Sequence, residues 1–367
     1  MALSTQWYGQ PKIVTSKKVF MKFFTKTLLF VFMMSCTGIL SAQDAPHFSL
    51  FEYAPLNTNP AFTGAFEGTF RVGGIYRDQW FSFLPNQFTT PAIYGDAPLI
   101  KGFRDKDWIG VGITFYSDNA GTGKLQVGGA LFSASYHFAL DKKRNSVFTI
   151  GLQGGSISRQ IDTQELLFGD DIANGNNTPG NTTTEMGLAD NRNLFDINVG
   201  VLLRSQVNKQ TNLRLGLAVK HLTTPTYTLI QSGNRPDSSF TDLPLRVTFH
   251  GGFGFDLNKK WTLSPTFIYN QIRNQNEIAL QGWMDYKLNP EKELSLRFGA
   301  GYRLRDAAEV LFGVDIKTFR FALAYDVNVS DLTEVSNTVG GLEFAASYIV
   351  KIFKDPEIKP IIFCPRF

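Results

Sequence analysis

Four histidines, His47, His137, His221 and His250, are the side chains best suited to ligate a metal ion or act as a general base. Each stands alone, because no second ligand follows at the spacing of a zinc site. The sequence also contains no G-x-S-x-G, no phosphate-binding loop and no H-E-x-x-H motif. We therefore predict no enzyme activity, no metal and no cofactor, although Ser, His and Asp residues that meet only after folding would not be detected in this way.

Acidic and amide side chains gather in residues 169–177, GDDIANGNN. Such residues ligate calcium, but an EF-type loop requires Asp or Asn where Ile172 stands. The segment is either a calcium-binding loop or a solvated loop, and its residues favour the second interpretation.

Charged residues occur at alternate positions within otherwise apolar segments. In FRFALAYDVNVS, residues 319–330, Phe319, Phe321 and Leu323 point to one side, and Arg320 and Asp326 to the other. This period of two predicts a β-strand with one apolar and one polar face. We predict that such polar faces form a lumen charge network of Arg71, Arg77, Arg297, Arg303, Asp315, Arg320, Asp326 and Glu343.

Fourteen segments follow this pattern and are long enough for tilted membrane strands. Many are longer than the usual strands of soluble sandwiches. In lipid an open sheet edge would leave backbone groups unpaired, so the sheet must close. We predict an all-β, transmembrane, antiparallel up-and-down β-barrel with strands near residues 69–80, 87–97, 107–117, 124–139, 146–159, 193–205, 211–222, 244–257, 260–273, 277–288, 293–304, 308–317, 319–329 and 341–352.

The connections between these segments provide a second criterion, because such barrels alternate short periplasmic turns with longer outer loops. The fifth, seventh and thirteenth connections are long, whereas the eighth and twelfth are very short. The second connection is longer than its rank predicts. We expect odd-numbered connections to be the long, outer ones.

Composition agrees with a strand-rich protein. The 33 Phe and 12 Tyr are interleaved with 33 Gly, which favours strands and turns. Lys and Arg (36) nearly balance Asp and Glu (32) and are scattered, so nothing indicates a nucleic-acid partner.

The N-terminus resembles a secretory signal. We expect residues 1–20 to be an upstream start-site extension and residues 21–42 a signal peptide, with Lys22 and Lys26 before the apolar core and cleavage before Gln43. A transmembrane helix and a lipoprotein cut before Cys36 are the alternatives. The mature chain would retain only Cys364, so no intramolecular disulfide would stabilise it. We divide the rest into a periplasmic or lumenal segment (43–68), the barrel (69–352) and a Pro-broken periplasmic tail (353–367).

Several phrases, in order, resemble one family, the type IX secretion system membrane proteins of the PorP/SprF family of Bacteroidetes. The resemblance thins between residues 161 and 243, and Thr58 interrupts the usual order before the first Asn-Pro-Ala phrase. The phrases are NPAFTG (59–64), YRDQW (76–80), YGDAPL (94–99), the block 299–332, GGLEFAASY (340–348) and CPRF (364–367).

This resemblance implies a non-enzymatic outer-membrane barrel of a Gram-negative bacterium that serves protein secretion and gliding motility at the cell surface. It would help to export or attach a large adhesin or repeat protein. Its implied partners are the type IX machinery, the secreted adhesin, periplasmic linking proteins and outer-membrane lipid. The rival interpretation is a passive channel or hydrophobic-solute transporter, which would need a continuous path through the lumen.

Two sets of residues are candidates for partner contact. Asn57, Asn59, Pro60 and Gly64 either contact a partner or cap the barrel floor through turn chemistry. In the tail, Cys364, Pro365, Arg366 and Phe367 form the second set; Cys364 is either a lipidation or disulfide site or, as we favour, a chemically quiet residue.

Overall fold

The computed structural model describes residues 47–81, 88–104, 106–121, 123–162, 166, 172–173, 175, 191–229, 242–289, 293–330 and 333–352. The chain divides into two units, residues 1–42 and residues 43–367, and every described residue belongs to the second. The predicted signal peptide, the tail residues 353–367 and most of the calcium candidate 169–177 lie outside the described residues.

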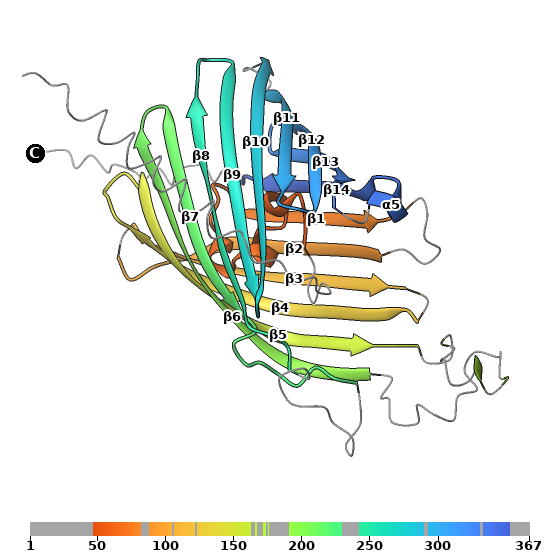
Figure 1. Cartoon of the computed structure of the whole chain (residues 1–367). Coiled ribbons are helices and arrows are strands. Elements are labelled where there is room, and N and C mark those ends of the chain that lie inside the picture. The colour runs from red at the N-terminus through yellow and green to blue at the C-terminus, as the bar shows by residue number, and fades with distance from the viewer. Residues whose placement is uncertain are drawn as a thin grey trace, which may run out of the picture. The chain divides into compact units, whose positions relative to one another are not determined.

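Fourteen antiparallel strands close into a barrel in which each strand pairs with its neighbours in the sequence (Figure 1). This confirms the predicted fold, and every predicted segment overlaps one strand. The strands are β1 (Phe70–Gln79), β2 (Phe88–Lys101), β3 (Trp108–Ala120), β4 (Leu125–Ala139), β5 (Ser146–Gln160), β6 (Asn191–Asn208), β7 (Thr211–Lys220), β8 (Arg246–Asp256), β9 (Trp261–Ile272), β10 (Gln275–Asn289), β11 (Leu294–Arg303), β12 (Ala307–Ile316), β13 (Phe319–Asn328) and β14 (Val339–Val350).

The barrel closes where the first strand meets the last. The β1–β14 register runs without interruption from Phe70 opposite Val350 to Gln79 opposite Gly341. Closure gives the backbone groups of both terminal strands their partners, which a bilayer core requires because it offers no water.

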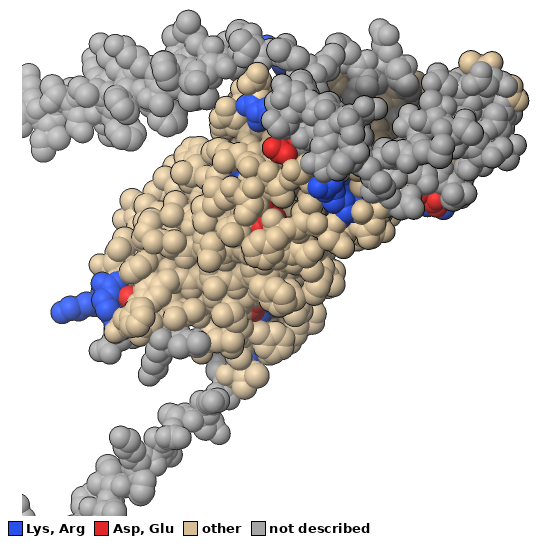
Figure 2. Space-filling view, turned by 90° about the horizontal axis from the view of Figure 1, so that it is seen from below, with Lys and Arg blue, Asp and Glu red and all other residues tan. Residues whose placement is uncertain are grey.

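The two faces of each strand differ as the alternation predicts. On β13 the exposed fractions of Phe321 and Leu323 are 46% and 36%, whereas those of Ala322 and Ala324 are 8% and 0%. On the face shown in Figure 2, the outer wall carries few charged side chains between its two ends. Apolar side chains therefore form the outer belt, and the polar positions face the lumen.

The connections depart from strict alternation. Those after β5, β7 and β13 are long, as predicted, but the odd-numbered connections after β3, β9 and β11 are tight turns. The last two turns need only residues 273–274 and 304–306, where Arg273 and Arg305 take positive φ angles of 52° and 60°. We call the end with the even-numbered connections the turn end, and the opposite one the loop end. Loop length therefore identifies the loop end only by the long connections after β5, β7 and β13, because the remaining connections are shorter at both ends.

Residues 47–66 form a plug inside the barrel, visible in red and orange behind β7 to β10 in Figure 1. The plug contains three short helices, η1 (Phe51–Tyr53), α2 (Pro55–Thr58) and η2 (Pro60–Phe62). Leu50, Tyr53 and Ala54 pack with Trp283 and Leu311 of the wall in one buried cluster. A further short helix, α5 (Thr333–Ser336), precedes β14. Within the described ranges, the helices are all too short to span a membrane.

Candidate functional site

The plug is held near the loop end by two carboxylates of the wall. The backbone N–H groups of Ser49 and Leu50 each donate to the Glu343 carboxylate at 2.7 Å. The Ser49 hydroxyl donates to Asp326 Oδ1 at 2.8 Å. Hydrogen bonds to charged acceptors are stronger than those between neutral groups, so this end of the plug is firmly fixed.

Two arginines neutralise these carboxylates. Arg77 donates to Glu343 and, at 3.0 Å, to Asp326; Arg303 Nη2 donates to Asp326 at 2.7 Å. No side chain in this group is more than 4% exposed. We call Arg77, Arg303, Asp326 and Glu343 the charge cluster. Because all four are buried, removing one partner would leave an uncompensated charge in the lumen, which is strongly destabilising.

The other charged residues predicted for the lumen lie toward the turn end, in separate pairs. Arg71 binds Asp96 at 2.8 Å, Arg297 binds Asp285 at 2.7 Å, and Arg320 lies 3.4 Å from Asp315. The structure thus brings four of the eight predicted residues into the charge cluster and distributes the other four over three pairs. Their partners Asp96 and Asp285 are absent from the predicted set. Strand register was the missing signal, because Asp96 stands opposite Arg71 and Asp285 opposite Arg297 in the sheet.

The middle of the plug, NPAFTG, follows local turn chemistry. Asn59 caps η2, accepting a hydrogen bond from the Ala61 N–H at 2.8 Å, and Pro60 occupies the first helical position, where no N–H is needed. Gly64 then reverses the chain with φ +65°, and its N–H donates to Asp96 at 2.7 Å. A residue with a side chain would be strained at that φ and would meet Gly110 of β3.

Asn59 also joins the plug to the wall. Its Nδ2 donates to Val201 O at 3.0 Å and lies 3.0 Å from His250 Nε2. Asn59 is completely buried. An amide buried in this way must find its hydrogen bonds in the protein, and here they fix the plug against β6 and β8.

Inward-facing glycines leave room for this part of the plug. A Cβ atom at Gly110 would lie 2.3 Å from Thr63 O, one at Gly151 2.4 Å from Ala61 N, and one at Gly200 2.0 Å from Asn59 Oδ1. All three are closer than real Cβ atoms come. We call the following residues, which stand on β3, β5, β6 and β7, the glycine cradle: Gly110, Gly112, Gly151, Gly200 and Gly216. The in-strand Gly110 thus allows the plug backbone to approach closely, and Gly112 leaves room for the side chains of Asp96 and Leu56.

Three of the four histidines, His137, His221 and His250, have structural partners, whereas Nε2 of buried His47 has no hydrogen-bond partner among the described residues. His137 Nε2 lies 2.9 Å from Thr63 O and therefore donates to it, while Nδ1 lies 2.8 Å from Thr149 Oγ1. His221 Nδ1 lies 2.9 Å from Asp196. Burial, followed by Arg77, Arg303 and Arg246, holds the pKa of His47 well below its usual value. Among the described residues, no group of three His, Cys, Asp or Glu side chains could hold a metal ion.

The first set of candidate contact residues lies inside the barrel. Asn59, Pro60 and Gly64 are buried, and Asn57 is half-buried, with its Oδ1 accepting from Thr114 at 3.0 Å. These residues contact the wall because turn and cap chemistry folds the segment into the lumen. They are therefore not presented to a partner in this structure. Cys364, Pro365, Arg366 and Phe367 lie outside the described residues.

The two ends of the lumen are built differently. At the loop end, Tyr227 and Leu243 from the β7–β8 connection pack on Leu131 and Ile157 of the inner wall. At the turn end, below the plug, lies a cavity of about 1090 Å³. We call this cavity the vestibule.

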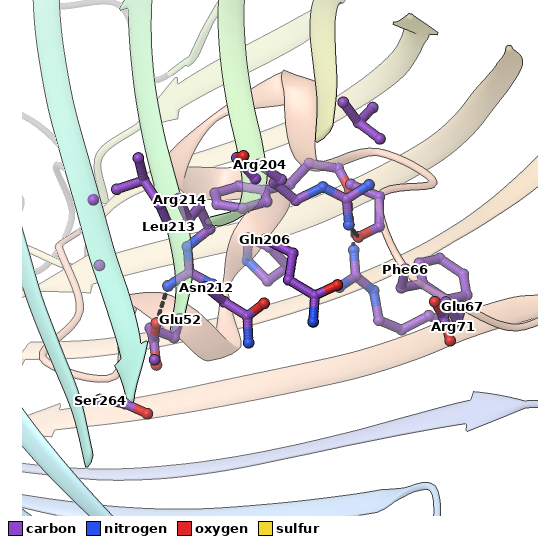
Figure 3. Close-up of a pocket in the computed structure, with 18 of the residues that line it drawn as sticks. Glu52, Phe66, Glu67, Arg71, Arg204, Gln206, Asn212, Leu213, Arg214 and Ser264 are labelled. Carbon is purple, nitrogen blue, oxygen red and sulfur yellow. Dashed lines mark hydrogen bonds and ion pairs between the residues drawn. The ribbon is translucent and has the colours of Figure 1, made fainter. Parts of the chain in front are cut away.

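The vestibule is polar and mainly basic. Arg71, Arg204 and Arg214, from β1, β6 and β7, reach into the same space, with Gln206 and Asn212 beside them (Figure 3). Arg214 pairs with Glu52 of the plug. Arg204 instead donates to a plug carbonyl, Ala65 O, at 2.6 Å. Groups of this kind bind anions and peptide amides without offering a nucleophile.

Several solved structures share the barrel form at low sequence identity. The *Pseudomonas putida* toluene transporter TodX is 14% identical, with 81% of this chain and 94% of that chain covered and a TM-score of 0.48. A *Pseudomonas aeruginosa* FadL homologue is 11% identical, with coverages of 79% and 92% and a TM-score of 0.39. A comparison with curated proteins finds no match.

The family comparison covers both the plug and nearly all of the barrel. The family model described as "Type IX secretion system membrane protein PorP/SprF" matches residues 40–348, which include β1 to β13 and all of β14 except its last two residues. The plug phrase NPAFTG and the charge cluster both lie within it. This chain belongs to the PorP/SprF family of type IX secretion system membrane proteins.

Proposed function

We propose that this chain is a non-enzymatic outer-membrane scaffold of the type IX secretion system, which assists export or surface attachment of a large adhesin or repeat protein. Family membership supports a role in secretion. The observation that carries the scaffold role is the plug, which is bonded to the wall at both of its ends. A channel would need a continuous path, whereas a scaffold needs a rigid interior.

The strength of the plug's attachment supports this choice. Ser49 and Leu50 are bonded to charged acceptors, Asn59 is buried against two strands, and Gly64 is bonded to Asp96. Opening a path along this wall would break these bonds and expose the apolar cluster around Tyr53 and Trp283. Such a cost is unsuited to passive solute traffic.

The proposed setting is the outer membrane, which the chain reaches through a cleaved signal peptide. The turn end then faces the periplasm, as in other barrels with short periplasmic turns. The machinery and periplasmic linking proteins would meet it there, and the secreted adhesin is the proposed cargo.

A strain that lacks this chain tests the proposal against the channel alternative. Surface proteins are labelled with a membrane-impermeant biotin reagent in the deletion strain, the parent and the complemented strain. We expect one large surface protein to be lost and then restored, while other surface proteins are retained. In parallel, the purified protein should give no steady conductance in a planar bilayer. An unchanged surface together with steady conductance would establish the channel instead.

The tail offers a second test, since β14, the strand that precedes it in the sequence, ends at the turn end. We expect deletion of residues 355–367 to leave barrel insertion intact, as judged by heat-dependent migration on gels, and to lower display of the same surface protein. A Lys354→Gln substitution serves as the control with an intact tail. Unchanged display after the deletion would exclude the tail as a docking element.

A further inference from the structure

Charge is distributed unequally between the two ends of the barrel. All six even-numbered connections contain a lysine, as Lys106, Lys142, Lys209, Lys259, Lys292 and Lys317 show in turn. The longest connection at the loop end, residues 161–190, contains six acidic residues and neither Lys nor Arg. The field of the barrel therefore attracts anions toward the turn end.

Three cationic side chains lining the vestibule lack an acidic partner. Within the described residues, Arg204, Lys143 and Arg144 form no ion pair, whereas Arg71, Arg214, Arg297 and Arg320 do. The acidic Glu67 lines the same cavity without an ion pair in the described part of the chain. Since three cations face a single free carboxylate, the vestibule has an uncompensated positive charge.

The position of Arg204 is fixed. Its Nη1 donates to Ala65 O at 2.6 Å, while its Nε is buried and has no hydrogen-bond partner among the described residues. Arg144 lies over the Trp108 ring, 5.2 Å from the centroid. The hydrogen bond to Ala65 O holds the Arg204 guanidinium in place before any ligand arrives, which reduces the entropy lost on binding.

Gln206 and Asn212 lie between the arginines in the vestibule (Figure 3). Both are exposed, and their amides offer donors and acceptors that suit a peptide backbone. The vestibule thus combines groups for acidic side chains with groups for main-chain amides.

We infer that the vestibule is a binding site for an acidic, extended peptide segment of a periplasmic partner protein. This inference rests on the proposed function, which places the turn end in the periplasm. Anionic lipid headgroups are the other source of negative charge. They can reach the outer rim of the turns, but Arg204, Arg214 and Arg71 face the lumen, which the wall separates from the bilayer.

The test uses the purified full chain in detergent and a fluorescein-labelled peptide of alternating Glu and Ser, with a Gln and Ser peptide as the uncharged probe. Fluorescence anisotropy gives Kd. We expect Arg204→Gln and the double variant Lys143→Gln/Arg144→Gln each to weaken binding of the acidic peptide by about tenfold, because each removes positive charge from the lining of the vestibule. Binding should also weaken as salt is raised.

The matched control is Lys259→Gln/Lys260→Gln, which removes two charges from an exposed turn at the same end without touching the vestibule. We expect its Kd to stay within about twofold of the parent value. An equal loss in this control, equal binding of the Gln and Ser peptide, or no binding by the parent would overturn the inference.

A lipid arm separates the two anion sources. The parent and the Lys143→Gln/Arg144→Gln variant are compared in nanodiscs of phosphatidylcholine with and without phosphatidylglycerol. We expect phosphatidylglycerol to leave the peptide Kd unchanged. Competition by phosphatidylglycerol that the variant abolishes would assign the site to lipid and overturn the inference. The peptide assay uses purified protein alone. If no peptide binds, the vestibule is not a peptide site, but the proposed role in secretion is still tested separately by the surface-labelling experiment.

Discussion

The two ends of the plug are held by opposite kinds of interaction. Near the loop end, the charge cluster binds Ser49 and Leu50 through charged hydrogen bonds. Toward the turn end, the glycine cradle receives Asn59 and Ala61 by shape, while Asp96 and Arg204 bind the plug backbone at Gly64 and Ala65. The contact at the charge cluster is stable only while every buried charge is paired. The contact at the glycine cradle requires positions without side chains, because the plug lies very close to the strands there.

This contrast predicts different responses to substitution. A lost charge partner leaves a penalty that a second, compensating substitution can relieve. A side chain added at Gly110 or Gly151 of the cradle would clash with the plug backbone, and no compensating charge relieves that clash. A second substitution can therefore compensate for a destabilising change in the charge cluster, but not for one in the glycine cradle.

The largest effect is expected from Arg77→Met in the charge cluster. Asp326 keeps Arg303, but Glu343 loses its arginine while it remains completely buried. We expect a loss of about 3–5 kcal/mol in the free energy of unfolding. Urea unfolding in lipid vesicles, followed by tryptophan fluorescence, measures it.

The control for this prediction is the double variant Arg77→Met/Glu343→Gln. It removes the unpaired charge and keeps an acceptor for the plug backbone, so it should lose less stability than Arg77→Met alone. A double variant that is less stable than the single one would show that charge pairing is not what holds this end.

The next largest effect is expected from Gly151→Ala in the cradle. The new Cβ would lie 2.4 Å from Ala61 N and from Pro60 C, both backbone atoms, so the plug or β5 must shift. We expect a loss of about 1–3 kcal/mol in the same unfolding measurement. Gly282→Ala on β10 is the matched control, because a Cβ there has open space. Equal stability of the two variants would contradict the cradle.

An effect of the same size is expected from Asn59→Ala, which removes the cap of η2 and the bond to Val201 O. We expect a loss of about 1–3 kcal/mol, the cost of leaving buried partners unsatisfied. Asn57→Ala serves for comparison, since half-buried Asn57 accepts one bond from Thr114; we expect about 0.5–1.5 kcal/mol there. A greater loss of unfolding free energy for Asn57→Ala than for Asn59→Ala would contradict the view that Asn59 contributes more to holding the plug.

The sequence predicted the wall far better than the interior. Strand alternation depends on a local period of two, so segments such as 319–328 could be located and oriented from neighbouring residues alone. The same faces predicted that Arg77 and Asp326 point inward. Pairing charged residues requires the register between strands, as Arg71 with Asp96 shows, and the alternation does not give it directly.

The plug was beyond such reasoning for a different reason. NPAFTG has clear turn chemistry, which left partner contact and a capping role equally open. The cradle glycines stand on four strands, β3 and β5 to β7, and their common purpose becomes visible only when the plug lies across them. Contacts between residues this far apart in the sequence produce no regular spacing, so the fit between plug and cradle cannot be recognised from the sequence.

The smallest predicted effect concerns Glu52, the plug residue that binds Arg214 between the two ends. Burial raises the pKa of Glu52, but Arg214, Arg297 and Arg320 outweigh it, and the pKa lies below its usual value of 4.5. A carboxyl whose pKa is lower in the folded than in the unfolded chain stabilises the fold above the unfolded value, and this contribution disappears as pH falls through the folded value. In Glu52→Gln the contribution is absent at every pH. We therefore expect the difference in unfolding free energy between parent and variant to be constant near neutral pH and to shrink as the medium is acidified below about pH 4.5. A difference that grows on acidification would mean that the arginines do not hold Glu52 in its ionised form.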